Sequence, residues 1–330
     1  MEALLALIGV LLVAVVAWLG AQVAILRPLL AIGLPYAGFV VFLAGLSYRV
    51  VRWSASPVPF RIPTTSGQQR SLPWLKAGRL ESPATLAGVL GRLALEILLF
   101  RSLFRNTRAD MRTGPRLVYA EDKFLWLGAL TFHWSLLVVV IRHLRFLLEP
   151  VPGAVTTLAG IDGFFQVTTP ALYATDFILV VALTYLLARR VRDPLLRYIS
   201  LPADYLVLFL VLGIAGSGIW MRYIGRVDMV AIKQMALSLV TFTPSVPAGI
   251  SPLFFVHLTL VAALAAVFPF SKLVHMAGGL LSPTRNLANT SRAARHVNPW
   301  NAPVAVHTYR DWEDEFRDKI RAAGLPLERR

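Results

Sequence analysis

At 330 residues, with 56% hydrophobic and 15% charged residues and a mean hydropathy of +0.63, the chain is more apolar than a soluble protein. Its net charge of +15 does not indicate nucleic-acid binding, because the basic residues lie between apolar runs rather than in one soluble domain. Zero cysteines exclude disulfides, thiolate-bound iron–sulfur clusters and covalently attached c-type haem. We therefore predict an all-α integral membrane protein, in which any redox group is held non-covalently by nitrogen or oxygen ligands.

Six apolar runs are long enough to cross the hydrocarbon layer as helices, which takes about 20 residues each. They cover 3–24, 29–50, 124–147, 171–188, 200–221 and 252–276. Only Arg27 and Pro28 separate the first two, so one long kinked or re-entrant unit is the alternative to two separate spans. The start of the chain has no basic region and no convincing cleavage site, which predicts a retained anchor rather than a signal peptide.

The distribution of Lys and Arg predicts which connections face the cytoplasm. Segment 51–122 carries eleven basic against five acidic residues, and the turn at 189–197 carries four against one. By contrast, 148–171 has no basic residue and 222–250 has three. We therefore expect the first two connections inside, the last two outside and both termini in the cytoplasm.

These assignments divide the chain into an N-terminal transmembrane hairpin (1–50), a cytoplasmic loop (51–122), a transmembrane bundle (123–276) and a cytoplasmic tail (277–330). The loop has apolar residues at helical spacing and arginines at steps of four, three and four. They are Leu90, Leu93, Ile97, Phe100 and Phe104, and Arg101, Arg105, Arg108 and Arg112. The pattern predicts an amphipathic helix along the inner headgroup layer or against a partner subunit; a solvated basic face resting on lipid is the alternative.

Four histidines lie within the apolar runs, in two pairs. His133 and His143 are ten residues apart, and His257 and His275 are eighteen apart. Ionisable residues in a membrane span are costly and indicate function by default. Two pairs on two spans suggest two metal centres, and two haem b groups with imidazole on both axial positions are our leading interpretation, because such ligation suits electron transfer.

Two alternatives to haem ligation remain at this stage. Each histidine could be a hydrogen-bonded residue that joins helices, or the four could form a proton or metal-ion relay in a transporter. Such relays normally include buried carboxylates, and only Asp176 and Asp204 approach membrane depth, each near the end of a span. The two remaining histidines, His296 and His307, lie in the polar tail and are expected to be ordinary surface residues.

The two histidine-bearing spans should be antiparallel, which pairs His133 with His275 toward the cytoplasm and His143 with His257 toward the outside. At 1.5 Å per residue the two spacings are about 15 and 27 Å, so tilt must absorb an offset of about 6 Å at each end. Residues eighteen apart are separated by five helical turns, so His257 and His275 would share one face of a helix. Residues ten apart differ by about 80° around the helix axis, so His133 and His143 would not.

Cations near the histidines are candidates to bind haem propionates. They are Arg142 and Arg145 for the outer haem and Lys272 for the inner one; interfacial snorkelling is the alternative for all three.

Two further segments suggest contacts with a quinone and with a soluble partner. The outer connection has an apolar stripe with Lys233 beside it, formed by Met229, Ile232, Met235 and Leu239, which predicts part of a quinone pocket or an interfacial helix without a ligand. In the tail, Trp312 and Phe316 flank acidic residues, which suits docking to a soluble partner. A free-standing capping helix is the alternative there.

The histidine spacings resemble those of the gamma subunit of respiratory nitrate reductases, a dihaem cytochrome b membrane anchor, over about 115–280. Three surrounding segments resemble more closely the DsrM family, the membrane cytochrome of DsrMKJOP complexes. These segments are LFRSLFRNTRAD at 99–110, RHVNPWN at 295–301 and YRDWEDEFRDKIRAAGLP at 309–326.

The resemblance implies that the four histidines are the axial ligands. It also implies quinone chemistry near the outer haem, with menaquinone or ubiquinone, and electron exchange with a cytoplasmic iron–sulfur subunit of the DsrK type and other Dsr subunits. The location it implies is the cytoplasmic membrane of a bacterium or archaeon, and the role is in dissimilatory sulfur metabolism. The nitrate reductase family has glycine before its second histidine, where this chain has Arg142, so the quinol-site residues do not carry over. A nitrate reductase gamma subunit proper is the alternative.

Overall fold

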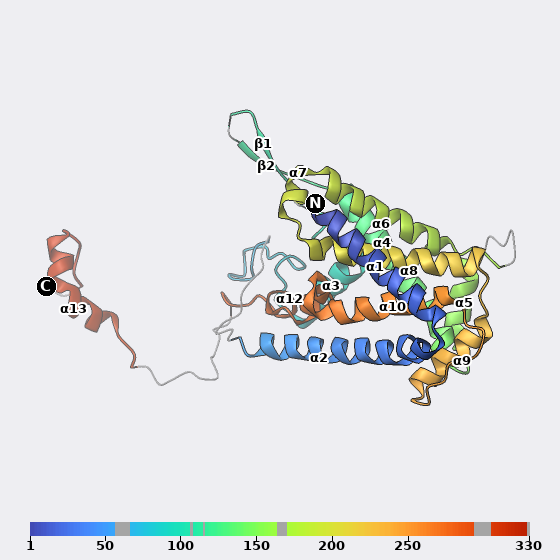
Figure 1. Cartoon of the computed structure of the whole chain (residues 1–330). Helices are drawn as coiled ribbons and strands as arrows, with labels where there is room; N and C mark the ends of the chain where they lie inside the picture. The colour runs from blue at the N-terminus through green and yellow to red at the C-terminus, as the bar shows by residue number, and fades with distance from the viewer. Residues whose placement is uncertain (57–66, 106–107, 115, 164–169, 294–304, 329–330) are drawn as a thin grey trace.

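The computed structural model describes residues 1–56, 67–105, 108–114, 116–163, 170–293 and 305–328, and most of them are helical (Figure 1). The long helices are α1 (Glu2–Gln22), α2 (Leu34–Ser54), α4 (Lys123–Leu147), α6 (Ala174–Arg192), α8 (Pro202–Ile219) and α10 (Pro252–Val267). The shorter ones are α3 (Leu86–Leu99), α5 (Gly153–Asp162), α7 (Pro194–Ile199), α9 (Met229–Val240), α11 (His275–Leu281), α12 (Pro283–Asn286) and α13 (Tyr309–Ala322). Two strands, β1 (Arg108–Arg112) and β2 (Arg116–Ala120), form one antiparallel hairpin.

Five helical segments within the described residues are long and apolar enough to cross a membrane: Glu2–Gln22, Ala24–Ser54, Lys123–Leu147, Pro202–Ile224 and Pro252–Phe270. The chain is therefore an all-α, multi-pass membrane protein. The first two are separate helices, as predicted, with a short turn of 3-10 helix at Ala24–Leu26 between them. The fourth predicted span, 171–188, corresponds to α6, a helix of 19 residues that ends in Arg189, Arg190 and Arg192 and is not among the five.

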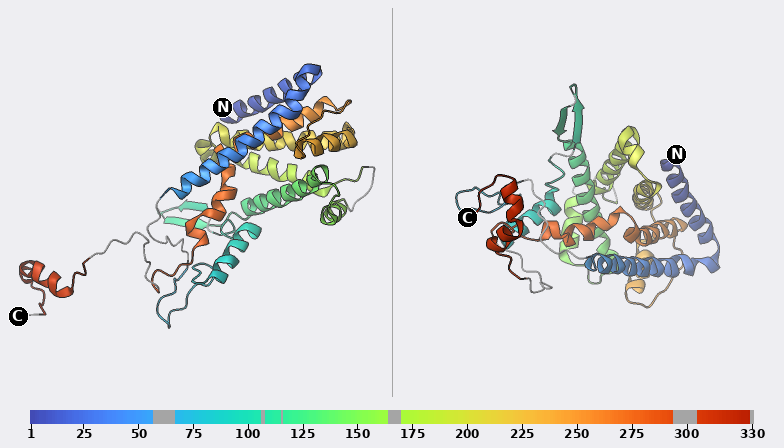
Figure 2. Two further views of the ribbon diagram at one scale, coloured as in Figure 1. Left: turned by 90° about the horizontal axis from the view of Figure 1, so that it is seen from below. Right: turned by 90° about the vertical axis from the view of Figure 1, so that its left-hand side faces the viewer.

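α10 is the central helix of the bundle, because it packs against α1, α2 and α8 (Figure 2). α8 also packs against α6, and α6 packs most closely against α4. The order α4, α6, α8, α10 thus forms the bundle, with α1 and α2 on its outside. α4 carries His133 and His143, and α10 carries His257. Among the described residues, α4 packs more closely on α6, and α10 on α1, α2 and α8, than the two helices pack on each other.

Glycines allow α2 to approach α10 and the turn after it. A Cβ atom added to Gly38 would lie 2.7 Å from the carbonyl oxygen of Ala262, and one added to Gly45 would lie 2.8 Å from the Pro269 ring. Neither site can hold a side chain without moving the helices. Gly38 and Gly45 are seven residues apart and share one helix face, as is common where membrane helices associate through small residues.

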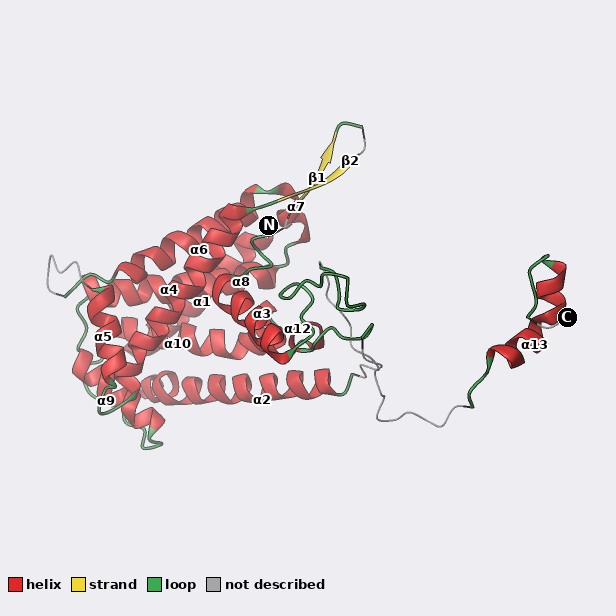
Figure 3. Ribbon diagram, turned by 180° about the vertical axis from the view of Figure 1, so that it is seen from behind, coloured by secondary structure: helices red, strands yellow, loops and turns green. Residues whose placement is uncertain are grey.

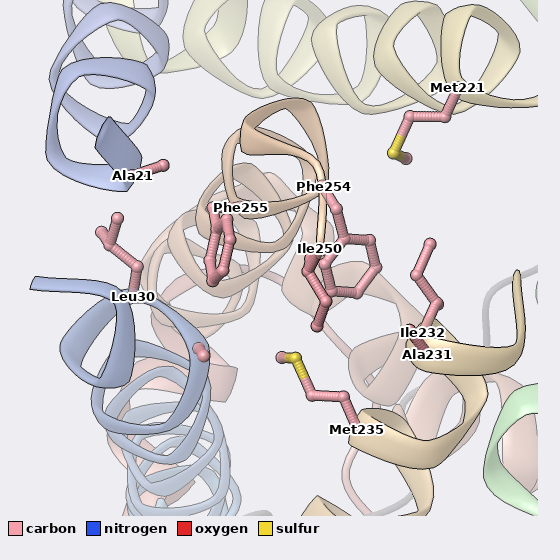
Figure 4. Packing of buried hydrophobic residues seen from close by; sticks show 10 residues of the cluster. Ala21, Leu30, Met221, Ala231, Ile232, Met235, Ile250, Phe254 and Phe255 are labelled. Carbon is pink, nitrogen blue, oxygen red and sulfur yellow. The ribbon is translucent and has the colours of Figure 1, made fainter. Parts of the chain in front are cut away.

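A hydrophobic cluster closes the end of the bundle where α10 begins (Figure 4). Phe254 and Phe255 pack there against Met235 of α9, Met221 and Leu30. The turn between α1 and α2 and helix α9 are therefore both anchored to the start of α10.

The expectation of one straight helix over 252–276 is wrong. α10 ends at Val267, two turns of 3-10 helix follow at Phe268–Phe270 and Lys272–Val274, and His275 begins α11. Pro269 lacks a backbone N–H, and Ser271 is extended, with its hydroxyl accepting a hydrogen bond from the Leu273 N–H. His257 and His275 are therefore not related by five turns of one helix.

The amphipathic helix predicted in the loop is shorter than its pattern. α3 ends at Leu99 because Phe100 adopts a left-handed conformation (φ 50°), and Arg108 and Arg112 lie in strand β1 instead of on a helix. Gly114 (φ 88°) occupies the hairpin turn. The glycine in the turn and the β-branched and aromatic residues of 116–120 are sequence signals for a β-hairpin. The helical spacing of the arginines obscured them.

The tail leaves the bundle and ends in α13, whose start is closed by a capping box between Thr308 and Asp311 (Figure 3). His296 and the whole segment RHVNPWN at 295–301 lie outside the described residues, whereas all of α13 lies within them. His307 is described and is exposed, as expected.

Candidate functional site

His133 and His275 lie next to each other at one end of the bundle. Their ring centroids are 6.1 Å apart, and the ring planes are nearly perpendicular at 84°. We call this the inner end, and the end that holds His143 and His257 the outer end. His133 is fixed in position by two aromatic rings, Phe132 and Phe100, whose centroids lie 4.8 and 4.9 Å from that of the imidazole.

Three of the four imidazoles bond the backbone through Nδ1. The contacts are 2.7 Å long and join His133 to the Ala129 oxygen, His143 to the Val139 oxygen and His275 to the Lys272 oxygen. A carbonyl oxygen only accepts, so Nδ1 carries the proton in each of them. The lone pair is then on Nε2, which points the metal-binding atom away from the helix backbone.

His257 reaches the same state through a side chain on another helix. Its Nδ1 lies 2.9 Å from the hydroxyl of Ser217, and that hydroxyl lies 2.7 Å from the oxygen of Gly213 and 3.0 Å from that of Ile214. The Ser217 hydroxyl donates its one hydrogen to these carbonyls and therefore accepts from His257. All four histidines thus have a bonded Nδ1–H and an Nε2 without a hydrogen-bond partner among the described residues.

Each histidine pair supplies two ligands, which fits a metal whose other ligands come from a cofactor. No group of three or more His, Cys, Asp or Glu side chains that could hold a metal ion occurs among the described residues. A metal between two imidazoles forms two metal–nitrogen bonds of about 2 Å each. With the distance from each bonded nitrogen to its ring centroid, the two centroids are then about 6 Å apart. The inner pair has this separation, and a porphyrin supplies the other four nitrogen ligands, so the donor set fits haem.

A cavity of about 290 Å³ at the inner end contains His133 and His275 in its lining. Arg189, Arg190 and Lys272 also line it, together with Asp204. The side chain of Asp204 is 5% exposed and pairs with Lys272 (2.8 Å) and Arg190 (3.5 Å). Lys272 was expected here from the sequence. Arg189 and Arg190 were not, because their charge had been interpreted only as a signal of membrane orientation.

At the outer end lies His143 of α4, which the sequence pairs with His257 of α10. The two candidate cations beside it differ in their contacts. Arg145 bonds the Tyr173 hydroxyl (3.2 Å), whereas the guanidinium of Arg142 is buried between the carboxylates of Asp162 and Asp176. The charge of Arg142 is already balanced inside the protein. Asp162 was not anticipated as its partner, because it lies in a connection between the predicted spans.

The apolar stripe on α9, predicted as part of a quinone pocket, lies partly in the core and partly at the surface. Ile232 and Met235 are buried in the cluster around Phe254, and Lys233 pairs with Glu149. Met229 alone of the stripe lines a surface cavity of about 300 Å³. The other lining residues are Pro170, Met221, Arg222, Arg226 and Val227.

The model of the nitrate reductase gamma subunit family matches residues 84–287, which include all four histidines of the two pairs. The chain belongs to this family. Helices α1 and α2 of this chain precede the matched region.

Two relatives share 44% and 45% identity with this chain. Both are named Hdr-like menaquinol oxidoreductase cytochrome b-like subunit, one from Archaeoglobus fulgidus and one from Archaeoglobus profundus. The alignments cover 81% of this chain, and 82% and 81% of the two relatives respectively. The similarity to these two relatives therefore extends over most of each protein.

Proposed function

We propose that this protein is the dihaem cytochrome b subunit of a membrane complex and carries electrons between the quinone pool and a cytoplasmic iron–sulfur partner. One observation carries the proposal: two imidazole pairs at opposite ends of the bundle, each ring with its Nδ1–H bonded and its Nε2 without a hydrogen-bond partner among the described residues. His133 and His275 are the proposed ligands of the inner haem, and His143 and His257 those of the outer haem.

Haem, when bound, supplies an iron that accepts and gives one electron at a time. The protein's part is to hold the two sites at fixed depths, since His133 and His143 are about 15 Å apart along the continuous helix α4. Two histidine ligands per haem would leave no coordination position open to oxygen, which suits electron transfer.

We propose that different basic residues bind the propionates of the inner and the outer haem. At the inner end Lys272, Arg189 and Arg190 line the cavity beside the histidines and suit this role. At the outer end we assign it to Arg145, because Arg142 is already paired with two carboxylates.

The names of the relatives support the electron donor and the partner. Both name a menaquinol oxidoreductase, which favours menaquinone over ubiquinone as the exchangeable substrate. Both are also called Hdr-like, which supports a partner of the heterodisulfide reductase type such as DsrK, and so a DsrM-like role with other Dsr subunits in sulfur metabolism. The inner end then faces the cytoplasm, consistent with the basic loops, and α13, with Trp312 exposed and Phe316 half-buried, offers a surface to that partner.

The test is a visible spectrum of the purified, haem-replete protein. We expect reduced-minus-oxidised bands of b-type haem and, by pyridine haemochrome, two haems per chain. Replacing either inner histidine by alanine should remove one haem, and replacing either outer histidine should remove the other. His307→Ala, in the exposed tail, is the matched control and should retain both.

A colourless preparation would reject the proposal in favour of a transporter or structural role for the histidines. Copurification with a heterodisulfide reductase-type subunit supports the partner we propose, and copurification with a molybdenum enzyme supports a nitrate reductase gamma subunit instead.

A further inference from the structure

A buried ionic cluster stands immediately beside the outer histidine pair. The Arg142 side chain is only 6% exposed, and those of Asp162 and Asp176 are 4% and 13% exposed. Nε of Arg142 lies 3.1 Å from Asp162, and Nη2 bonds Asp176. One guanidinium therefore sits between two carboxylates in the part of the molecule where unpaired charge is most costly.

Further hydrogen bonds fix both carboxylates. Asp162 accepts from the backbone N–H of Thr175 (2.9 Å) and from its hydroxyl (2.7 Å), while Asp176 accepts from the hydroxyl of Tyr223 (2.9 Å). The cluster thereby joins α4, α5, α6 and the π-helical segment Trp220–Ile224 that continues α8. Any movement of α4 at this level would break several of these contacts.

A second arginine completes the charge balance. The Tyr173 ring lies between two guanidinium groups, with Arg142 3.8 Å and Arg222 4.1 Å from its centroid. Two arginines and two aspartates leave this group with no net charge. Removing one member leaves a full charge uncompensated.

The charges of this cluster act on the proposed haem ligand. Arg142 is the residue before His143, Arg145 is two residues after it, and Asp176 pairs with Arg142. Oxidation of haem iron adds one positive charge. A nearby carboxylate stabilises the oxidised form and lowers the reduction potential, while a nearby guanidinium raises it. Because the side chains of the cluster are buried, both effects are stronger than at the surface.

From this arrangement we infer that Asp176, Arg142 and Asp162 are positioning residues of the outer redox centre. They hold α4 so that His143 faces His257, and their opposed charges set the reduction potential of the outer haem independently of the inner one. The inference rests on the proposed function, since it concerns one of the two proposed haems.

The test is a spectro-potentiometric titration of the purified holoprotein, in which the outer haem is identified by its loss in His257→Ala. Asp176→Asn should raise the potential of the outer haem, and Arg142→Gln should lower it. The double variant, which removes one charge of each sign, should return it toward the wild-type value. The inner haem should keep its potential in all three proteins.

Asp204→Asn is the matched control at the inner end, where that carboxylate lines the cavity with His133 and His275. It should raise the potential of the inner haem only. If Arg142→Gln does not accumulate, Arg222→Gln removes the other positive charge of the cluster and gives the same test, with a fall expected in the potential of the outer haem.

Opposite signs for the aspartate and arginine variants support the inference, because a purely structural disturbance of His143 would shift the potential in one direction for both. Shifts of the same sign, equal shifts of both haems, or no shift at all overturn it while leaving the dihaem function intact. A preparation with no haem overturns the proposed function itself.

Discussion

Ser217→Ala tests how the structure holds the outer histidine His257. Of the four imidazoles, His257 is the one whose Nδ1 acceptor is a side chain, so the acceptor can be removed without touching the histidine or the backbone. In the variant the Nδ1–H of His257 loses its partner at 2.9 Å in a tightly packed region. The imidazole is then free to rotate or to change tautomer, which would place a hydrogen on the metal-binding nitrogen.

The expected magnitude follows from the hydrogen bond that is lost. An unsatisfied buried donor costs about 1–3 kcal/mol, and loss of an outer-sphere partner of a metal-bound histidine typically weakens metal binding about 10–100-fold. We therefore expect Ser217→Ala to lower the occupancy of the outer haem and to broaden its spectroscopic signals. The inner haem, whose ligands bond the backbone, should remain.

The assay is haem titration of the apoprotein, followed by pyridine haemochrome and low-temperature spectra of the reduced protein. Ser135→Ala is the matched control, because Ser135 is also buried and also bonds the carbonyls three and four residues before it, at 3.1 and 2.7 Å. Ser217→Thr keeps a hydroxyl and should restore binding. If Ser217→Ala and Ser135→Ala have equal effects on the outer haem, the hydrogen bond does not position His257.

Two further predictions concern packing and the tail. Gly38→Leu forces a side chain against the backbone of Ala262 and should destabilise the bundle by about 1–3 kcal/mol in detergent unfolding; Gly9→Leu, at a site with no neighbour within 4 Å, should be neutral, and equal effects would contradict the close approach of α2 to α10. Hydrogen bonds from the Thr308 hydroxyl and N–H lower the pKa of Asp311, so this cap stabilises α13 at neutral pH and is lost as the pH falls from about 4 through the lowered folded-state value. Spin-label mobility at the start of α13 should rise in that range, and Thr308→Ala should show the same mobility already at neutral pH; a label that stays immobile in both would refute the role of the cap.

The candidate site was partly visible in the sequence because a histidine in an apolar run is conspicuous at any level of folding. The spacings alone selected His133, His143, His257 and His275 and predicted which would face each other. The same logic placed Lys272 at the inner end. These predictions depend on helical repeat and on the cost of polar groups in lipid, which are local properties of the chain.

Other elements could not be read from local pattern. The arginine steps in 101–112 continue a helical period, yet the chain turns at Phe100 and pairs as a hairpin. The apolar run 252–276 gives no sign that its helix stops at Val267, although Pro269 and Ser271 supply the means. In both places the helical period of the sequence outweighed the local signals for a break, and the hairpin is held by the pairing of β1 with β2.

The sequence by itself determined the membrane setting, the approximate helices and the histidines that we propose as metal ligands, since these follow from composition and from the helical repeat. Only the tertiary structure decided that Arg142 belongs to Asp162 and Asp176, that Ser217 orients His257, and that Arg189 and Arg190 face the inner histidines. Those partners come from different helices, and a buried charge or donor takes whichever partner the packing brings within reach.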